Sequence, residues 1–278
     1  MKLRCNKCSF SADYQVNNPW TCEQCNRKYS YKFGKILMCD DMSTSDTKSW
    51  HDNIAKNTNK KSFQSVGYRS SIHQSCMINT FARAFINEEE GDTLDVGCGN
   101  GIFAEKLSSK LNRKLPYYGV DFSIEQLKLV NTDIILPVNS NAENLPFDDN
   151  QFDLVYSSEV IQNIEDISKL IPELLRVTKQ NGLLAISSLN ASSIIRKLIM
   201  KLDPNNQDKK YFLRSKNEPH IYLRNPNNII DKIDKFRFSL EGVHWIYSPL
   251  NYSTFERSSR SEVKKRFAQN FLCIIKKK

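Results

Sequence analysis

The chain has 278 residues, of which 40% are hydrophobic and 26% are charged, and its formal net charge is +9. This composition excludes a disordered chain, because enough apolar surface is present to offset the conformational entropy lost on folding. No apolar run approaches the roughly 20 residues that cross a bilayer, and charges and cysteines stand where a signal peptide would be apolar. We therefore expect a cytoplasmic protein without a membrane span.

Two Cys-x2-Cys pairs mark the first 40 residues. Cys5 and Cys8 form the first pair, and thirteen residues separate it from the second pair, Cys22 and Cys25. Each such turn directs two thiolates at one ion, and two turns complete the tetrahedral set that Zn²⁺ prefers. Because this segment is too small for a hydrophobic core of its own, a structural zinc ribbon over residues 1–40 is predicted. A redox site or a metal-free remnant is the alternative.

Residues 41–62 are rich in Ser, Thr, Asn and Lys and show no apolar period. Such a composition is typical of a linker or of a loosely attached helix. A second domain is expected to begin near residue 63.

A ligand-binding turn is predicted after the apolar strand at 93–96. Glycines at positions 97, 99 and 101 allow a sharp turn and a close approach of a ligand, and a helix begins at residue 102. The third glycine comes too early for the G-x-G-x-x-G pattern of dinucleotide sites. The next strand ends at Asp121, where a carboxylate can accept both hydroxyls of a ribose, and Ser123 is expected to cap a helix over 124–130.

Later segments complete an α/β pattern. The sequence predicts a loop, a turn and a fourth strand within residues 141–158, a core-facing helix over 167–177 and a buried fifth strand at 182–186. Segments 237–246 and 270–275 are expected to form a final antiparallel pair.

The series LDVGCGNG, GVDFS and NAENLPFDDNQFDLVYSSEVI resembles the class I S-adenosylmethionine-dependent methyltransferases, of the type 11 group, over about residues 65–190. The resemblance implies an α/β fold with a Rossmann-like seven-stranded sheet, preceded by the zinc ribbon. It also implies a cofactor-binding core over 63–190, followed by a substrate lid and the final antiparallel strands over 191–278. The ribbon is similar to the small zinc ribbons of the tRNA-methyltransferase activator type, which leaves a protein partner open.

The same resemblance implies where S-adenosylmethionine binds. Asp95 and Gly97 would meet the methionine end of the cofactor, Asp121 would hold the ribose, and Asn141 and Ala142 would meet the adenine. The full set of expected cofactor residues is Asp95, Gly97, Cys98, Gly99, Asn100, Gly101, Asp121, Phe122, Asn141, Ala142 and Ser157.

One departure from the family concerns the catalytic base. Ser157 and Glu159, at the end of the fourth strand, would border the methyl-donor pocket. Many relatives have Glu-His after the apolar pair that follows this strand, whereas this chain has Gln162 and Asn163. A general base is therefore missing at that place, and the catalytic residue is unknown.

The basic charge of the chain lies in its last third. Residues 196–278 hold 19 Lys and Arg against 8 Asp and Glu, a net charge of +11. Because small-molecule relatives form the acceptor lid from the segment after the fifth strand, an acceptor with a negative group is expected. The candidate bases are His220 and His244 in this segment and His73 ahead of the first strand.

Three functions are consistent with this pattern. The leading hypothesis is O-methylation of a small, anionic metabolite or biosynthetic intermediate, with N- or C-methylation as variants. The second is an rRNA or tRNA methyltransferase that binds RNA through the ribbon and the basic segment. The third is a non-catalytic, zinc-bearing partner protein, and the intact Gly97 and Asp121 speak against it.

Overall fold

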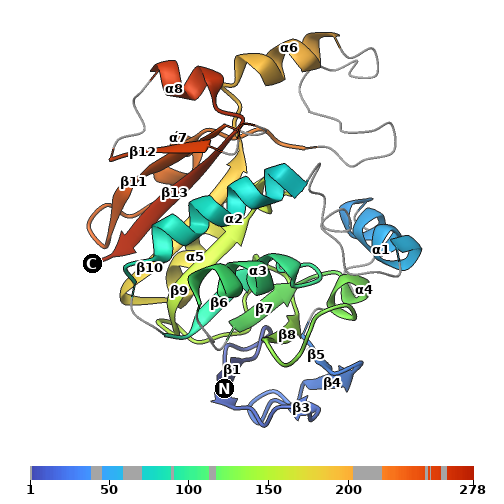
Figure 1. Cartoon of the computed structure of the whole chain (residues 1–278). Coiled ribbons are helices and arrows are strands. Elements are labelled where there is room, and N and C mark those ends of the chain that lie inside the picture. The colour runs from blue at the N-terminus through green and yellow to red at the C-terminus, as the bar shows by residue number, and fades with distance from the viewer. Residues whose placement is uncertain are drawn as a thin grey trace.

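The computed structural model describes residues 2–38, 46–58, 71–88, 91–112, 117–202, 221–247, 250, 252–257 and 262–278 (Figure 1). The strands are β1 (Lys2–Arg4), β2 (Ser11–Asp13), β3 (Trp20–Thr21), β4 (Lys28–Lys32), β5 (Lys35–Leu37), β6 (Thr93–Val96), β7 (Tyr117–Asp121), β8 (Ile135–Asn139), β9 (Phe152–Ser158), β10 (Thr178–Leu189), β11 (Phe238–Tyr247), β12 (Tyr252–Glu256) and β13 (Asn270–Lys277). The helices are α1 (Asp46–Thr58), α2 (Ser71–Phe85), α3 (Ile102–Leu111), α4 (Ile124–Leu127), η2 (Ile161–Asn163), α5 (Leu170–Val177), α6 (Ile194–Leu202), α7 (Pro226–Ile230) and α8 (Glu262–Phe267).

The predicted sheet forms the centre of the molecule. Its seven core strands run in the order β8-β7-β6-β9-β10-β13-β11. The first five are parallel to their neighbours, whereas β13 is antiparallel to both β10 and β11, as expected for the two final segments. The predicted Rossmann-like α/β fold is confirmed.

Helices cover both faces of this sheet, which explains why the parallel strands are apolar runs rather than alternating ones. Helices α2 and α3 pack on one face, where Phe81 and Phe103 meet Tyr156 of β9. Helix α5 packs on the other face. It begins at Leu170, three residues later than predicted, and Pro172 lies in its first turn, where a missing N–H is tolerated.

The ribbon is joined to the sheet rather than separate from it. Strand β5 pairs in parallel with β8, through Ile36 beside Val138 and Leu37 beside Asn139. Strands β4 and β3 continue beyond β5, and β12 extends the opposite edge, which gives eleven strands in the described part of the chain. This extension has no local sequence signal, because the pairing joins segments about a hundred residues apart.

The segment predicted as a linker or loosely attached helix contains α1. This helix packs against α4, at the side of the sheet where β7 and β8 end (Figure 1). Among the described residues, no helix is long and apolar enough to cross a membrane.

Candidate active site

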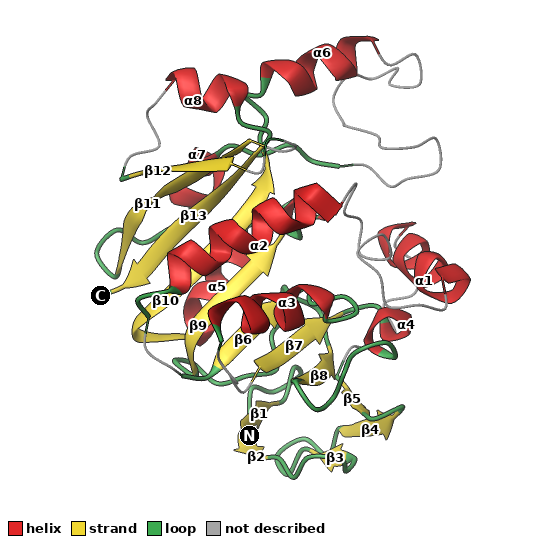
Figure 2. Cartoon of the chain, viewed as in Figure 1, coloured by secondary structure: helices red, strands yellow, loops and turns green. Residues whose placement is uncertain are grey.

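Four strands end at one edge of the sheet and bring the predicted residues together. The loops after β6, β7, β8 and β9 all leave the carboxyl ends of parallel strands (Figure 2). In open sheets of this kind the ligand crevice lies outside these ends. The geometry of each loop therefore decides what the crevice can hold.

The glycine turn after β6 has the backbone that only glycine adopts easily. Gly97, Gly99 and Gly101 have φ angles of +81°, +54° and +78°. A Cβ at position 97 would lie 2.1 Å from Cγ2 of Val160, and one at position 101 would lie 2.6 Å from Cδ1 of Ile135. Packing within the protein already requires glycine at these two positions, beyond any ligand contact.

Cys98 and Asn100 shape the same turn from within. Cys98 is buried, and a Cβ on Gly119 of the next strand would come within 2.8 Å of its Sγ. Asn100 is fully buried, and its Oδ1 accepts a hydrogen bond of 3.1 Å from the backbone N–H of Ile102. These two side chains hold the start of α3 in place beside the turn.

Asp95 is a buried carboxyl group at the end of β6. Tyr156 donates a hydrogen bond of 3.0 Å from its hydroxyl to Oδ2 of Asp95. Burial raises the pKa of Asp95 to about 8 in spite of this hydrogen bond. A buried carboxyl group with a raised pKa is complementary to a cation, since a positive partner restores its ionised form. Its chemistry fits an ammonium group such as that of the methionine moiety.

Asp121 lies at the corresponding end of β7. Its Oδ2 accepts from the N–H of Gly99 at 2.9 Å, and its Oδ1 accepts from the N–H of Ser123 at 2.8 Å. Burial raises the pKa of Asp121 to about 6 although both hydrogen bonds lower it. Each carboxylate oxygen keeps a second lone pair, so the group can still accept two hydroxyls of one ribose. As predicted, Ser123 caps α4, by accepting from the N–H of Gln126.

The loop after β8 carries the expected adenine residues. Asn141 and Ala142 are half-buried, and Oδ1 of Asn141 accepts from the N–H of Glu143 at 3.0 Å. Asn139, which the sequence analysis did not single out, donates from Nδ2 to the carbonyl oxygens of Asp121 and of its neighbour Phe122, both at 3.0 Å. A polar residue at the end of a buried strand is the signal that could have identified it.

Helix α1 contacts the loop that holds Phe122. The ring of His51 meets the ring of Phe122 edge to face at 5.9 Å, and its carbonyl oxygen accepts from Nε2 of Gln126 at 3.3 Å. Asp52 accepts a hydrogen bond from the Ser123 hydroxyl. Helix α1 thus contacts the segment from Phe122 to Gln126 at the end of β7.

Residues from three elements meet at the end of β9. Ser157 donates to the carbonyl oxygen of Val96 at 3.1 Å, which ties β9 to β6. Glu159 follows with a φ of +59°, and its N–H donates to the Ser187 hydroxyl at 3.1 Å. This backbone conformation is uncommon for a residue with a side chain and marks a place where surrounding contacts hold the chain.

The side chain of Glu159 meets a histidine and an asparagine. Its Oε1 lies 3.1 Å from Nε2 of His73, which comes from α2, and it also accepts from the amide of Asn270 in β13. Asn270 is fully buried, and its Oδ1 has no hydrogen-bond partner among the described residues. Of the two candidate histidines that the structure describes, His73 is the one that lies at this edge of the sheet.

Of the other two candidate histidines, the structure describes His244 but not His220. His244 is buried in β11, three strands from β9, which corresponds to about 14 Å. Burial, and then the charge of Arg83, lower the pKa of His244 to about 4, and its ring packs against Phe255. His220 lies outside the described residues.

Gln162 occupies the place where many relatives carry a Glu-His pair. It is fully buried, and its Oε1 accepts from the backbone N–H of Leu189 at 3.0 Å. Its backbone carbonyl accepts from the N–H of Tyr222 at 2.7 Å. Gln162 therefore connects η2 to the end of β10 and to the segment that begins at Ile221.

The four ribbon cysteines converge as predicted. Their Sγ atoms all lie within 4.8 Å of one another, with 3.6 Å between Cys5 and Cys25 and 3.5 Å between Cys8 and Cys22. Four thiolates about 2.3 Å from a central Zn²⁺ would lie roughly 3.8 Å apart, so the cluster has the size and donor set that zinc requires.

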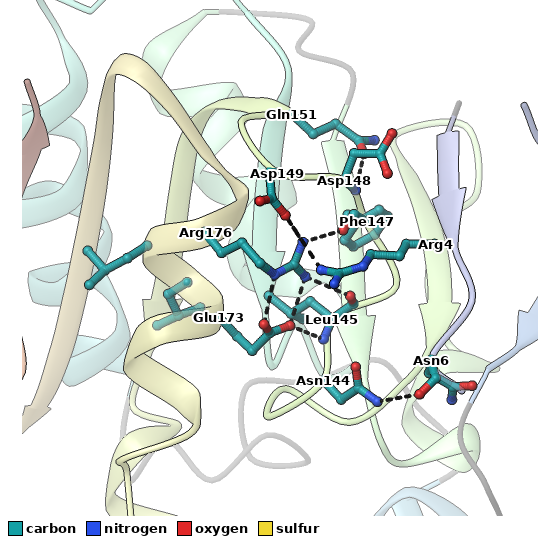
Figure 3. Close-up of polar contacts among 12 residues, drawn as sticks. Arg4, Asn6, Asn144, Leu145, Phe147, Asp148, Asp149, Gln151, Glu173 and Arg176 are labelled. Carbon is teal, nitrogen blue, oxygen red and sulfur yellow. Dashed lines mark hydrogen bonds and ion pairs between the residues drawn. The ribbon is translucent and has the colours of Figure 1, made fainter. Parts of the chain in front are cut away.

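The ribbon contacts the loop of residues 144–151, through Arg4 beside Asp149 and Asn6 beside Asn144 (Figure 3). Arg176 of α5 donates to Oε1 of Glu173 at 2.7 Å, to the carbonyl oxygen of Phe147 at 2.7 Å and to Oδ1 of Asp149 at 2.9 Å. From the ribbon, the N–H of Arg4 donates to the carbonyl oxygen of Pro146 at 3.0 Å. Hydrogen bonds thus connect the ribbon, the loop and α5 with one another.

Comparisons with known proteins agree with this geometry. Residues 94–186 match the family described as methyltransferase domain. Over 125 residues the chain is 34% identical to a 2-phytyl-1,4-naphtoquinone methyltransferase of Trichormus variabilis, a match covering 42% of this chain and 55% of that protein. Over 104 residues it is 35% identical to a demethylmenaquinone methyltransferase of Staphylococcus epidermidis, covering 35% and 43%. The chain spans about half the length of the curated relatives it matches.

Solved structures show the same fold. A methyltransferase of Thermotoga maritima, titled a possible histamine N-methyltransferase, superposes with a TM-score of 0.56 at 18% identity, covering 82% of this chain and 99% of that one. A chain from the complex of the Haloferax volcanii Trm112 methyltransferase activator with its putative methyltransferase gives 0.53 at 16% identity, covering 84% and 98%. The chain contains a class I S-adenosylmethionine-dependent methyltransferase domain. The matched residues, 94–186, are of the methyltransferase type 11 kind, and a four-cysteine ribbon precedes them.

Proposed function

We propose that this protein transfers a methyl group from S-adenosylmethionine to a small, hydroxyl-bearing ring compound. The observation that carries the proposal is the set of buried acids and glycines at one sheet edge, with the Glu159 and His73 side chains 3.1 Å apart beside it. The proposal keeps the predicted division into ribbon (1–40), linker (41–62), cofactor-binding core (63–190) and lid with final strands (191–278).

The residues present fit S-adenosylmethionine. When bound, the cofactor supplies an electrophilic methyl group. Asp95 would pair with its ammonium group, Asp121 with its ribose hydroxyls, and the loop of Asn141 and Ala142 with its adenine. Phe122, held between Asn139 and α1, would flank the ring.

The proposed acceptor loses one proton as it is methylated, either from the hydroxyl oxygen that becomes a methyl ether or from the ring carbon that gains the methyl group. With an ionised Glu159, which only accepts hydrogen bonds, Nε2 of His73 would carry the hydrogen between them, and Nδ1 would be the nitrogen that accepts a proton. His73 would take the proton, and Glu159 would stabilise the resulting imidazolium. Asn270 would orient Glu159 and offer its buried Oδ1 to the acceptor.

The class of acceptor is supported by the curated relatives. Two of them are named for methyl transfer to naphthoquinone or demethylmenaquinone compounds. We infer an acceptor of this ring class in its hydroxylated, reduced form. Zinc in the ribbon is proposed to be structural, since the ribbon cysteines lie beside β5 and the 144–151 loop rather than at the end of β9.

The function is tested by incubating the protein with methyl-labelled S-adenosylmethionine and reduced demethylmenaquinone, or an extract of cellular quinols, RNA and protein. We expect label in the quinol fraction. Label in RNA alone would favour the RNA methyltransferase hypothesis and overturn the proposed acceptor, and cofactor binding without any transfer would favour the non-catalytic one.

Replacing His73 by Gln is expected to lower kcat about 100-fold or more, because a positioned base contributes at least that much. The dissociation constant of S-adenosylmethionine should stay within twofold, since His73 is not among the cofactor residues. His244→Gln is the matched control and should retain the parent kcat. Equal activity of His73→Gln and the parent would exclude His73 as the base.

A further inference from the structure

Helix α6 turns its apolar side away from the protein. A surface helix ordinarily buries that side against the core. Here four apolar residues of the helix are exposed to solvent by 44, 48, 54 and 70%: Ile194, Ile195, Leu198 and Leu202, respectively. Arg196, on the other side of the helix, is buried and donates from Nη2 to the carbonyl oxygen of Gln269 at 2.9 Å.

The exposed residues form one continuous stripe. At about 100° per residue, the four apolar side chains fall within an arc of about 100° on the helix. Lys197 and Lys201 are also exposed and lie along one border of that stripe. The helix contains three basic residues and no acidic one. An apolar stripe bordered by lysines is the pattern of helices that lie in the plane of a membrane surface.

Helix α8 adjoins α6 and extends the same surface. The two helices are in contact and lie next to each other at the same end of the molecule (Figures 1 and 2). Phe267 of α8 is 53% exposed, and Arg266 next to it is exposed as well. The two helices together thus present several exposed apolar side chains with cations around them.

This surface is fixed to the edge of the sheet that carries the site. Helix α6 begins five residues after β10 ends, and Nδ2 of Asn190 donates to the carbonyl oxygen of Ala268 at 2.8 Å. Asn270, which contacts Glu159, pairs directly with Leu189 in the sheet. The α6–α8 surface is therefore at the rim of the crevice rather than on a remote face.

We propose that α6 and α8 form a docking surface for a bilayer that contains anionic phospholipids. The stripe would enter the region between headgroups and acyl chains, and the lysines would contact lipid phosphates. Because nine helical residues measure only about 14 Å, the helix would lie in the surface and not span it. The excess of 11 positive charges over residues 196–278 is complementary to such a surface.

The docking gives a route for an apolar acceptor. The docking proposal rests on the proposed function only for the purpose of docking. A lipid-soluble ring compound would pass from the bilayer to the crevice without crossing water. Binding to lipid does not require methyl transfer. The two proposals can therefore fail separately.

The test is sedimentation of the whole protein with vesicles, without cofactor or acceptor. We expect binding to vesicles of phosphatidylcholine with 30% phosphatidylglycerol, and at least tenfold weaker binding to phosphatidylcholine alone or at high salt. The variant with Ile195→Ser, Leu198→Ser and Leu202→Ser should lose at least tenfold in affinity for the anionic vesicles. Phe236→Ser is the control. Phe236 is 93% exposed and precedes β11, at the amino-terminal end of that strand and so at the end of the sheet away from α6 and α8.

Folding and self-association are checked in the same set of variants. Unchanged S-adenosylmethionine binding by the triple variant shows that it is folded. Absence of vesicle binding by the parent, or equal binding by parent and triple variant, overturns the proposal. A parent dimer that the triple variant converts to a monomer, without vesicle binding, would assign the surface to a second copy of this chain instead.

Discussion

Replacing Asp121 by Asn is expected to weaken S-adenosylmethionine binding about 100-fold. The carboxylate is the group that can accept both ribose hydroxyls, and two charge-assisted hydrogen bonds contribute about 3 kcal/mol together beyond neutral ones. Asparagine offers a single acceptor oxygen, which must also serve the N–H groups of Gly99 and Ser123. Isothermal titration calorimetry measures the affinity directly.

The same substitution weakens cofactor binding but should make the unliganded protein more stable than the parent as pH rises. The pKa of Asp121 is about 6 in the folded protein, against an ordinary value near 3.8. Between about pH 4 and pH 6 the unfolded chain therefore holds fewer protons, and the free energy of unfolding of the unliganded parent falls as pH rises. Relative to the parent, Asp121→Asn should gain about 3 kcal/mol between pH 4 and pH 7, since two pKa units correspond to that amount.

A surface acid provides the control for both measurements. Asp133 is exposed and precedes β8, so Asp133→Asn should alter neither cofactor affinity nor the pH dependence. If Asp121→Asn bound S-adenosylmethionine as tightly as the parent, the placement of the ribose at Asp121 would be wrong. If the pH dependence were the same in variant and parent, the carboxyl group would not be buried as described.

The fold could be predicted because its signals are local. Apolar strands such as Thr93–Val96, the glycine turn after it and the acid at Asp121 recur in a fixed order, and each is read from neighbouring residues. The pairing of β5 with β8 has no such signal. Its two strands are short and far apart in sequence, and edge pairing depends on which backbone groups are left unpaired after folding.

The site was predicted less completely than the fold, for the same reason. The expected acids and glycines follow strand ends directly, and the structure brings them to one edge. The contact of His73 with Glu159 joins residues 86 positions apart, and sequence alone gave no reason to prefer His73 over His244. The support from Asn139 and from α1 was also hidden, because both act through tertiary contacts with the Asp121 loop.

These contacts connect the ribbon to the cofactor site. The N–H of Met38, which follows β5, donates to the carbonyl oxygen of Asn139 at 2.8 Å, and Leu37 pairs with the same residue. The side chain of Asn139 in turn holds the backbone of Asp121 and Phe122. Asn139 therefore connects the ribbon to the backbone of Asp121 and Phe122.

Removing zinc is expected to destabilise the protein and to weaken cofactor binding about tenfold. A ribbon this small is stabilised mainly by its metal, so chelation or Cys22→Ser should release β5 from the edge of the sheet. Asn139 would then lose its backbone partner, and the Asp121 loop would lose part of its support. Elemental analysis, the melting temperature and calorimetric S-adenosylmethionine affinity give three separate measurements.

Two further variants serve as controls. The first tests whether loss of any thiol has the same effect, and the second tests whether the effect of zinc removal reaches the cofactor site through Asn139. Cys39→Ser, which removes a cysteine that belongs to neither Cys-x2-Cys pair, should keep the parent's zinc content, melting temperature and affinity. Asn139→Ala should keep zinc but weaken S-adenosylmethionine binding, because the ribbon stays folded while its connection to Asp121 is cut. A purified protein that contains no zinc, or whose cofactor affinity is unaffected by chelation, would contradict a structural metal acting through β5.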